Sequence, residues 1–217
     1  MKPTMHSNTH PTFRCPAFKS RVVPVIVITD VAQAVPMAHA LLAGGIDVME
    51  ITLRHSAGLS AIEAVARQVP AMHVGAGTVT HAAEMVRVQN AGASFALSPG
   101  MSDALVQAAL DCRLPFMPGV MTPSEIMRAR DHGFSLVKLF PAVQAGGLDM
   151  LKALGGPLAD MRFCPTGGIT IDKLADYLRL GNVAMVGGSW LTPTDAVQQG
   201  RWDEVTRLAS HAMMLSA

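Results

Sequence analysis

Short apolar runs alternate with longer amphipathic segments along almost the whole chain, and this alternation constrains the possible folds most strongly. Short runs rich in β-branched residues are typical of buried strands, whereas apolar residues that recur about every three or four positions are typical of helices. Strands are predicted at residues 22–28, 47–53, 72–79, 94–100, 115–120, 136–142, 162–169 and 183–191. Helices are predicted between them, and several of these segments end in glycine, which favours a helix C-terminus.

Eight strands that each precede a helix predict an α/β fold, a closed (β/α)8 TIM barrel, as a single compact domain. The repeat is close to the shortest that can hold a strand, a helix and two loops, so we expect short loops. An open doubly wound sheet shares the alternation and is the alternative fold, but the number of strands favours closure. We assign residues 21–217 to the barrel and residues 1–20 to an N-terminal tail or leading helix.

The composition excludes several classes of protein. Half of the 217 residues are hydrophobic and 15% are charged, which provides enough apolar material for a large core. The formal net charge is +1 and no run of Lys and Arg occurs, so no nucleic-acid partner is expected. Cys15, Cys112 and Cys164 have no CxxC spacing, which favours reduced thiols over disulfides or a zinc site. No segment has the pattern of a signal peptide or a membrane span, so we expect a cytoplasmic protein with no membrane partner.

Residues with possible chemistry gather at the C-terminal ends of the predicted strands, where barrels bind their ligands. Glu50 and Arg54 belong to "MEITLR" at the second strand, and Lys138 lies inside "LVKLF" in the sixth. Thr78 ends "GAGT" at the third strand, and Pro99 lies in "SPG" at the end of the fourth. We therefore expect these side chains to meet at one mouth of the barrel.

Glycine pairs follow the seventh and eighth predicted strands, in "PTGGI" and "GGSW". A glycine pair before a helix exposes backbone N–H groups to an anion, and the loops after these two strands often bind phosphate in barrels. The alternative is that the glycines only permit tight turns. A hydroxyl residue beside each pair favours phosphate. The predicted phosphate-binding residues are Thr166, Gly167, Gly168, Gly187, Gly188 and Ser189.

Lys138 is a cation in a run that is otherwise typical of a buried strand. The alternation of side chains places Leu136, Lys138 and Phe140 on one side, so we expect the lysine to point into the barrel. Burial favours the neutral amine, a nucleophile that forms a Schiff base with a ketone. Glu50, among apolar neighbours, is the candidate proton acceptor and donor. The alternative is that Lys138 and Glu50 form only a structural ion pair.

Arg54 offers a planar fork that suits a substrate carboxylate, although an arginine just past a strand is more often a surface residue. A metal site is not indicated, because neither HxH nor HExxH occurs near the site. His55 and His73 are the histidines nearest to the predicted site, and no such spacing joins them to a carboxylate. We expect neither a metal nor an organic cofactor.

Eight ordered blocks resemble the 2-dehydro-3-deoxy-phosphogluconate and 4-hydroxy-2-oxoglutarate aldolases (KDPG and KHG aldolases). The blocks are "VPVIVI", "MEITLR", "VGAGTV", "SPG", "PGVMTPSE", "VKLFPA", "RFCPTGGI" and "VGGSWL", and the resemblance covers roughly residues 20 to 192. It implies that Lys138 forms the Schiff base, that Glu50 is the general acid and base, and that Arg54 binds the carboxylate. It further implies the following contacts: Thr78, Pro99 and Phe140 with substrate, and Thr166, Gly167, Gly168 and Ser189 with phosphate.

The resemblance also implies a homotrimer and no metal. One departure is His55, which stands where members often have threonine after "TLR", and this affects the expected substrate preference. Our hypothesis is a class I aldolase that cleaves 2-dehydro-3-deoxy-6-phosphogluconate reversibly to pyruvate and D-glyceraldehyde 3-phosphate. The alternatives are the same chemistry on 4-hydroxy-2-oxoglutarate or on 2-dehydro-3-deoxy-6-phosphogalactonate, a sugar-phosphate isomerase or epimerase without a Schiff base, and a non-catalytic binding barrel.

Overall fold

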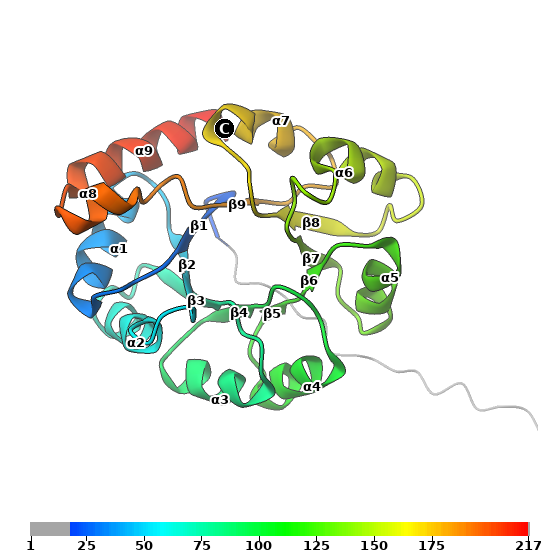
Figure 1. Ribbon diagram of the computed structural model, residues 1–217, viewed down its shortest axis with the longest axis horizontal. Coiled ribbons are helices and arrows are strands. Elements are labelled where there is room, and N and C mark those ends of the chain that lie inside the picture. Colours follow the sequence, from blue (N-terminus) through cyan, green and yellow to red (C-terminus); the bar gives the residue numbers. More distant parts are fainter. Residues whose placement is uncertain (1–17, 217) are drawn as a thin grey trace, which may run out of the picture.

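Strands and helices alternate in the predicted order in the computed structural model, which describes residues 18–216 (Figure 1). Most of the predicted tail, residues 1–20, therefore lies outside the described residues. The strands are β1 (Val22–Ile26), β2 (Val48–Thr52), β3 (His73–Gly77), β4 (Phe95–Leu97), β5 (Phe116–Met117), β6 (Gly119–Val120), β7 (Leu136–Leu139), β8 (Arg162–Pro165) and β9 (Val186–Gly188). The helices are η1 (Val31–Gln33), α1 (Ala34–Ala43), α2 (Gly58–Gln68), α3 (Ala82–Asn90), α4 (Asp103–Cys112), α5 (Pro123–Asp131), α6 (Gly147–Gly155), η2 (Ile171–Lys173), α7 (Leu174–Leu178), α8 (Thr194–Gln198) and α9 (Trp202–Leu215).

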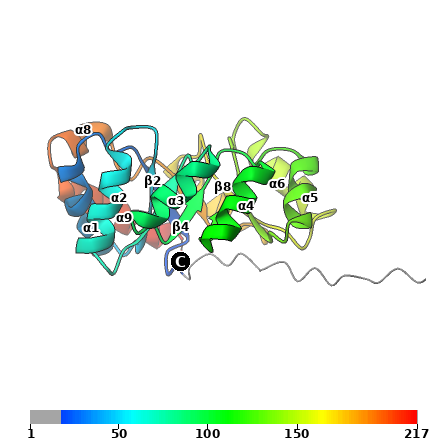
Figure 2. The ribbon, with the colours of Figure 1, turned by 90° about the horizontal axis from the view of Figure 1, so that it is seen from below.

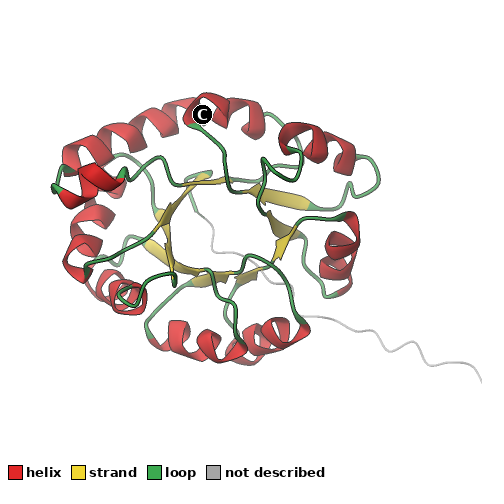
Figure 3. Cartoon of the chain, in the orientation of Figure 1, coloured by secondary structure: helices red, strands yellow, loops and turns green. Residues whose placement is uncertain are grey.

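The strands form curled parallel sheets with the helices outside them (Figure 3). One sheet has the order β5-β4-β3-β2-β1-β9 and the other has the order β6-β7-β8. Neighbouring strands place Glu50 opposite Gly75 of β3, and Lys138 opposite Gly119 of β6 and Cys164 of β8. The predicted α/β class with a parallel sheet is therefore confirmed.

Several strands end earlier than predicted, and their last predicted residues belong to loops instead. The seventh predicted strand, 162–169, shrinks to β8 because Gly167 and Gly168, with positive φ, turn the chain after its end. The eighth, 183–191, shrinks to β9, which includes Gly187 and Gly188 and ends with them. The fifth predicted strand, 115–120, is divided into β5 and β6 by Pro118. Proline has no backbone N–H to donate to a ladder, which explains the interruption. The freed C-terminal residues form the mouth where the predicted site lies.

The core lies between the strands and the helices that cover them. All five positions of β2 are buried, as expected for a parallel strand that is covered on both faces. Phe95, Phe134 and Phe163 are among the largest fully buried side chains. Seen from the side, α3 and α4 lie next to each other outside the sheet (Figure 2). Within residues 18–216, no helix is long and apolar enough to cross a membrane.

Helix α5 shows how local sequence sets the loop after a strand. Its N-cap residue Thr122 accepts a hydrogen bond from Glu125 N, and Glu125 Oε2 accepts from Thr122 N at 2.8 Å and from Met121 N at 2.7 Å. Pro123 occupies the first turn, where its missing N–H costs nothing. The hydrogen bond from the backbone N–H of Met121 lowers the pKa of the Glu125 carboxyl and is the largest influence on it. Burial acts in the opposite direction, and the hydrogen bonds from Thr122 lower the pKa further. This reciprocal cap fixes where the chain leaves β6, the strand beside Lys138.

Candidate active site

Lys138 and Glu50 form a buried ion pair between two strands that are far apart in the sequence. The Lys138 Nζ donates a hydrogen bond to Glu50 Oε1 at 2.9 Å, across 88 positions of sequence. The side chains are 5% and 1% exposed, respectively. The ring centroid of Phe140 lies 5.5 Å from the same Nζ. The structure thus brings together the two residues that were predicted separately as nucleophile and proton shuttle.

Gly77 makes room for the Glu50 carboxylate. It ends β3, opposite Thr52 of β2, and a Cβ at this position would overlap Glu50 Oε1. Thr52, also buried, donates its hydroxyl to Ile26 O at 3.0 Å and so ties β2 to β1. The Glu50 side chain is therefore held by close packing on one strand and by its contact with Lys138 on another.

Replacing Gly77 by alanine is expected to lower kcat by roughly 10²-fold for any reaction in which Glu50 takes part. The reason is that displacing a catalytic group by about 1 Å lowers the rate by that factor in an oriented site. The added methyl group must push the carboxylate away from Lys138. The measurement is steady-state kinetics, with thermal unfolding to check the fold. Gly181→Ala is the matched control, because a Cβ there meets nothing within 4 Å. Equal activity of the two variants would contradict this account of Gly77.

Most of the predicted substrate-binding and phosphate-binding residues line one cavity of about 280 Å³. Neither Lys138 nor Glu50 is among its lining residues, but Phe140 both lines it and contacts Lys138. Val25 and Val27, at the end of β1, also line it and were not predicted. The lining residues are Val25, Val27, Arg54, Phe140, Thr166, Gly167, Gly168, Ile169, Gly187, Gly188 and Ser189.

The first glycine pair, Gly167 and Gly168, has the geometry of an anion site. Gly167 and Gly168 have φ values of 102° and 77°, a region that residues with a side chain rarely adopt. Their backbone N–H groups donate no hydrogen bond to another described residue, so both donors are available to a ligand. Gly187 pairs with Thr166 in an isolated parallel bridge, and a Cβ on Gly187 would overlap the Thr166 hydroxyl. Both glycine pairs therefore reach the same cavity.

Arg54 lies at the mouth of this cavity with its guanidinium unpaired among residues 18–216. An exposed, unpaired fork can bind a carboxylate without first breaking an ion pair. The neighbouring His55 does not line the cavity, and its Nδ1 accepts a hydrogen bond from Ala57 N at 3.2 Å. The imidazole is thus engaged with its own loop.

Thr78 and Pro99 lie at neighbouring strand ends but do not line the cavity. Thr78 has φ 59°, which is an outlier for a β-branched residue and fixes the turn after β3. Pro99 is packed closely against Gly119, since a Cβ on Gly119 would overlap the Pro99 carbonyl group. Ser98 Oγ supports this packing by accepting from Gly119 N at 3.3 Å and donating to Gly100 O at 2.5 Å.

Cys164 is a neighbour of the ion pair that sequence reasoning missed. It is opposite Lys138 in the ladder and is buried. Burial raises the pKa of its thiol to about 11, although the nearby Lys138 acts in the opposite direction. The thiol is therefore neutral at physiological pH. The signal was present in the sequence, because Cys164 and Thr166 share one side of a strand that ends at the site.

The described part of the chain contains no group of three or more His, Cys, Asp or Glu residues that could hold a metal ion. The polar groups at the site are instead an amine, a carboxylate, a guanidinium, hydroxyls and backbone amides. This set is suited to covalent catalysis by an amine and to recognition of an anionic ligand.

Comparison with known proteins agrees with the geometry. The family model of KDPG and KHG aldolase matches residues 17–208. The 2-dehydro-3-deoxy-phosphogluconate aldolase of Pseudoalteromonas atlantica is 50% identical over 88% of this chain and 89% of its own length. The KHG/KDPG aldolase of Escherichia coli is 47% identical over 88% of this chain and 90% of its own. The KDPG aldolase of Legionella pneumophila, solved with pyruvate captured as a covalent carbinolamine intermediate, is 43% identical with a TM-score of 0.87, covering 89% of this chain and 94% of its own.

Proposed function

Because the chain belongs to the KDPG and KHG aldolase family, we propose that it cleaves 2-dehydro-3-deoxy-6-phosphogluconate reversibly to pyruvate and D-glyceraldehyde 3-phosphate through a Schiff base on Lys138. The chain is an aldolase, a carbon–carbon lyase. The observation that carries the proposal is the buried 2.9 Å contact between Lys138 Nζ and Glu50 Oε1. It joins a nucleophile to a group that can take its proton.

The first half of the reaction forms the Schiff base. Proton transfer from Lys138 Nζ to Glu50 Oε1 leaves a neutral amine and a neutral acid, which removes both charges from a buried place. The amine attacks the C2 ketone of the substrate and gives a carbinolamine. Glu50 returns the proton to the C2 hydroxyl, which leaves as water, and an iminium remains on Lys138.

The second half breaks the carbon–carbon bond. The Glu50 carboxylate takes the C4 hydroxyl proton, the electrons of the C3–C4 bond pass to the iminium, and the aldehyde departs. The resulting enamine takes the proton from Glu50 at C3. Water then hydrolyses the new iminium and releases pyruvate from Lys138. One carboxyl group thus serves as base and acid in turn, which requires it to stay within reach of both the nitrogen and the substrate.

The remaining site residues bind the two ends of the substrate. In this proposal Arg54 binds the carboxylate of the pyruvate half, and Thr78, Pro99 and Phe140 contact the carbon chain. The phosphate lies on the glycine turns, and the proposed contacts are Thr166, Gly167, Gly168, Gly187, Gly188 and Ser189. The free N–H groups of the first glycine pair and the shared cavity support this arrangement.

Arg54→Met is expected to raise KM for the phosphogluconate substrate by roughly 10- to 100-fold, because a charge-assisted hydrogen bond contributes about 1.5–3 kcal/mol. The methionine keeps much of the side-chain bulk but cannot bind a carboxylate. Steady-state kinetics give KM and kcat separately. Arg67→Met is the matched control, since Arg67 is exposed and its pair with Glu63 is 3.8 Å long. An unchanged KM in Arg54→Met would exclude Arg54 as the carboxylate ligand.

The phosphate site favours a phosphorylated substrate, while the family also includes KHG aldolases. The test compares kcat/KM for release of pyruvate from 2-dehydro-3-deoxy-6-phosphogluconate, from its galactonate epimer and from 4-hydroxy-2-oxoglutarate. We expect both phosphorylated acids to give higher values than 4-hydroxy-2-oxoglutarate, because only they use the glycine turns. Of the two, we expect the phosphogluconate acid to give the higher value, because relatives at 47–50% identity are named for it. Release of pyruvate from none of the three would overturn the proposed function.

We further propose that the two sheets form one closed (β/α)8 barrel and that residues 21–217 are its single domain. Two isolated parallel bridges support closure on one side. Phe163 of β8 pairs with Val183, which precedes β9, and Thr166, which follows β8, pairs with Gly187 of β9. On the other side β5 and β6 are separated only by Pro118. The family resemblance supports a homotrimer, which a solution mass of three times 22.9 kDa would verify. We also propose a cytoplasmic location, in keeping with cysteines whose spacing favours reduced thiols.

A further inference from the structure

The two glycine pairs at the phosphate site are glycine for different reasons. Gly167 and Gly168 have positive φ values, which residues with a side chain rarely adopt. Gly187 and Gly188 belong to β9, and their φ values are not positive. The backbone conformation of the second pair therefore does not require glycine. The absence of a side chain is what matters there, because neighbouring groups approach both residues closely.

Trp190 occupies the space that Gly188 leaves open. A Cβ on Gly188 would overlap the Cζ3, Cε3 and Cη2 atoms of the indole, which all belong to its six-membered ring. This ring therefore lies directly against the Gly188 backbone. A Cβ on Gly187 would instead overlap the Thr166 hydroxyl. Because successive residues of a strand face opposite sides, the second pair is held between Thr166 and the indole.

The indole is held in this place by packing. Trp190 is half-buried, and its Nε1 is buried without a hydrogen-bond partner among residues 18–216. A buried donor without a partner is unfavourable, so hydrogen bonding does not explain the position of the ring. The contact with Gly188 does, because only glycine allows such a close approach of a ring to the backbone. We therefore regard the ring as a support for Gly188.

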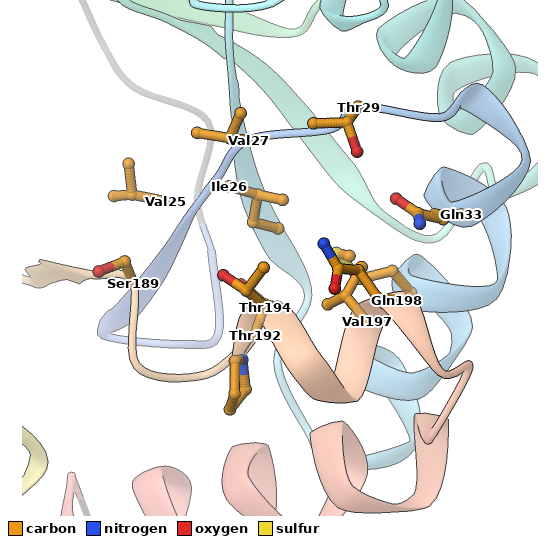
Figure 4. Close-up of a pocket in the computed structure, with 12 residues that line it drawn as sticks. Val25, Ile26, Val27, Thr29, Gln33, Ser189, Thr192, Thr194, Val197 and Gln198 are labelled. Atoms are coloured by element: carbon orange, nitrogen blue, oxygen red, sulfur yellow. The ribbon is translucent and has the colours of Figure 1, made fainter.

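Ser189 lies between Gly188 and Trp190 in the chain, and the indole that folds back on Gly188 sets its direction. Ser189 is exposed and lines the 280 Å³ cavity of the predicted phosphate-binding residues, whereas Trp190 does not. Ser189 also lines the neighbouring cavity drawn in Figure 4, where its hydroxyl is turned away from Thr192 and Thr194. The Ser189 hydroxyl and the backbone N–H groups of Ser189 and Trp190 donate to no described residue. The ring thus supports one side of the turn, and free donors remain for an anion.

We propose that Trp190 is a positioning residue that determines the preference for phosphorylated substrates, because its ring holds Gly188 and Ser189 where they reach the phosphate. The inference rests on the proposed function, since it requires a substrate phosphate on the glycine turns. Trp190 does not line the cavity and acts through its neighbours, so it is not a catalytic residue. Without the ring the turn can relax, and a displacement of about 1 Å is enough to impair an oriented site.

The test compares two reactions in the wild type, in Trp190→Leu and in Trp190→Phe. Cleavage of 2-dehydro-3-deoxy-6-phosphogluconate uses the phosphate site. Inactivation by pyruvate with borohydride uses Lys138 and Glu50, but pyruvate has no phosphate. We expect Trp190→Leu to lower kcat/KM for cleavage by roughly tenfold or more, because hydrogen bonds to a charged group weaken. The inactivation rate should change by less than about twofold, because the two ends of the site share no partner.

Trp190→Phe removes the unpartnered N–H and keeps a smaller aromatic ring, so its kcat/KM for cleavage should lie between those of the wild type and Trp190→Leu. Trp202→Leu is the matched control. Trp202, at the start of α9, is the other of the two tryptophans and does not line the phosphate cavity. Both rates of the control should stay within about twofold of the wild type. Thermal unfolding shows whether each variant is folded.

Two results in folded Trp190→Leu overturn the inference. An equal loss in both reactions shows that Trp190 supports only the fold, and an unchanged kcat/KM for cleavage shows that the turn does not need the ring. If Trp190→Leu does not fold, Trp190→Phe must lower kcat/KM for cleavage at an unchanged inactivation rate, and any other result overturns the inference. Failure of the proposed function is distinguishable, because pyruvate and borohydride would then not inactivate the wild type.

Discussion

Replacing Lys138 by methionine is expected to lower kcat for pyruvate release by roughly 10⁵-fold, the scale of loss seen when a covalent nucleophile is removed. Methionine fills a similar volume but has no amine to attack the ketone. The change also leaves Glu50, which is 1% exposed, as an unpaired carboxyl group in the core. Breaking a buried pair in this way costs about 3–5 kcal/mol of folding free energy. A loss of activity must therefore be separated from a loss of fold.

The double variant Glu50→Gln/Lys138→Met separates the two effects. It removes both charges, so we expect thermal stability to return close to that of the wild type while activity stays at the level of the single variant. Activity is measured as pyruvate release and stability as the midpoint of thermal unfolding. If Lys138→Met retains more than about a tenth of the wild-type kcat while folded, an amine at this position is not the nucleophile.

Glu50→Gln is expected to lower kcat by about 10²- to 10⁴-fold, the usual contribution of a positioned acid or base. Glutamine can still accept a hydrogen bond from Lys138 Nζ, but it can neither take the C4 hydroxyl proton nor return it. Because the amine is still present, the variant should form a covalent adduct with pyruvate, but more slowly than the wild type, since glutamine cannot take the proton from Lys138 Nζ. The expected result is thus a low kcat with a trapped adduct, measured by kinetics and by mass spectrometry on the same preparation.

The matched control for this variant is Glu63→Gln. Glu63 is an exposed carboxylate on α2 whose ion pair with Arg67 is 3.8 Å long, and exposed pairs contribute little. It should leave kcat within about twofold of the wild type. A Glu50→Gln enzyme with kcat as high as Glu63→Gln would contradict the role of Glu50 as proton shuttle.

The position of Lys138 could be predicted because side chains alternate along a strand, and one polar residue in an apolar run identifies the inward side. The contact with Glu50 depends on how β2 and β7 face each other across the interior, which local sequence does not encode. The sequence left open whether these two residues are catalytic or only a structural pair. The structure shows that they are paired. In the proposed mechanism, proton transfer within the pair frees the amine.

The strand ends were predicted too long because apolar residues continue into the loops. Val27 continues the first apolar run, yet it is 45% exposed and lines the cavity of the predicted phosphate-binding residues after the end of β1. A further cavity, lined among others by Gln33 of η1 and Gln198 of α8, could not be predicted at all. Gln33 and Gln198 are on short helices at opposite ends of the chain, and no periodic pattern relates them. Only the folded arrangement brings their amides together.

The most direct test of the central claim is reduction with borohydride in the presence of pyruvate, followed by peptide mass spectrometry. The account predicts one reduced pyruvate adduct per chain, on the peptide that contains Lys138, and no adduct when pyruvate is left out or when Lys138 is methionine. An unmodified Lys138 after this treatment, in an enzyme that still releases pyruvate from its substrate, would contradict the account.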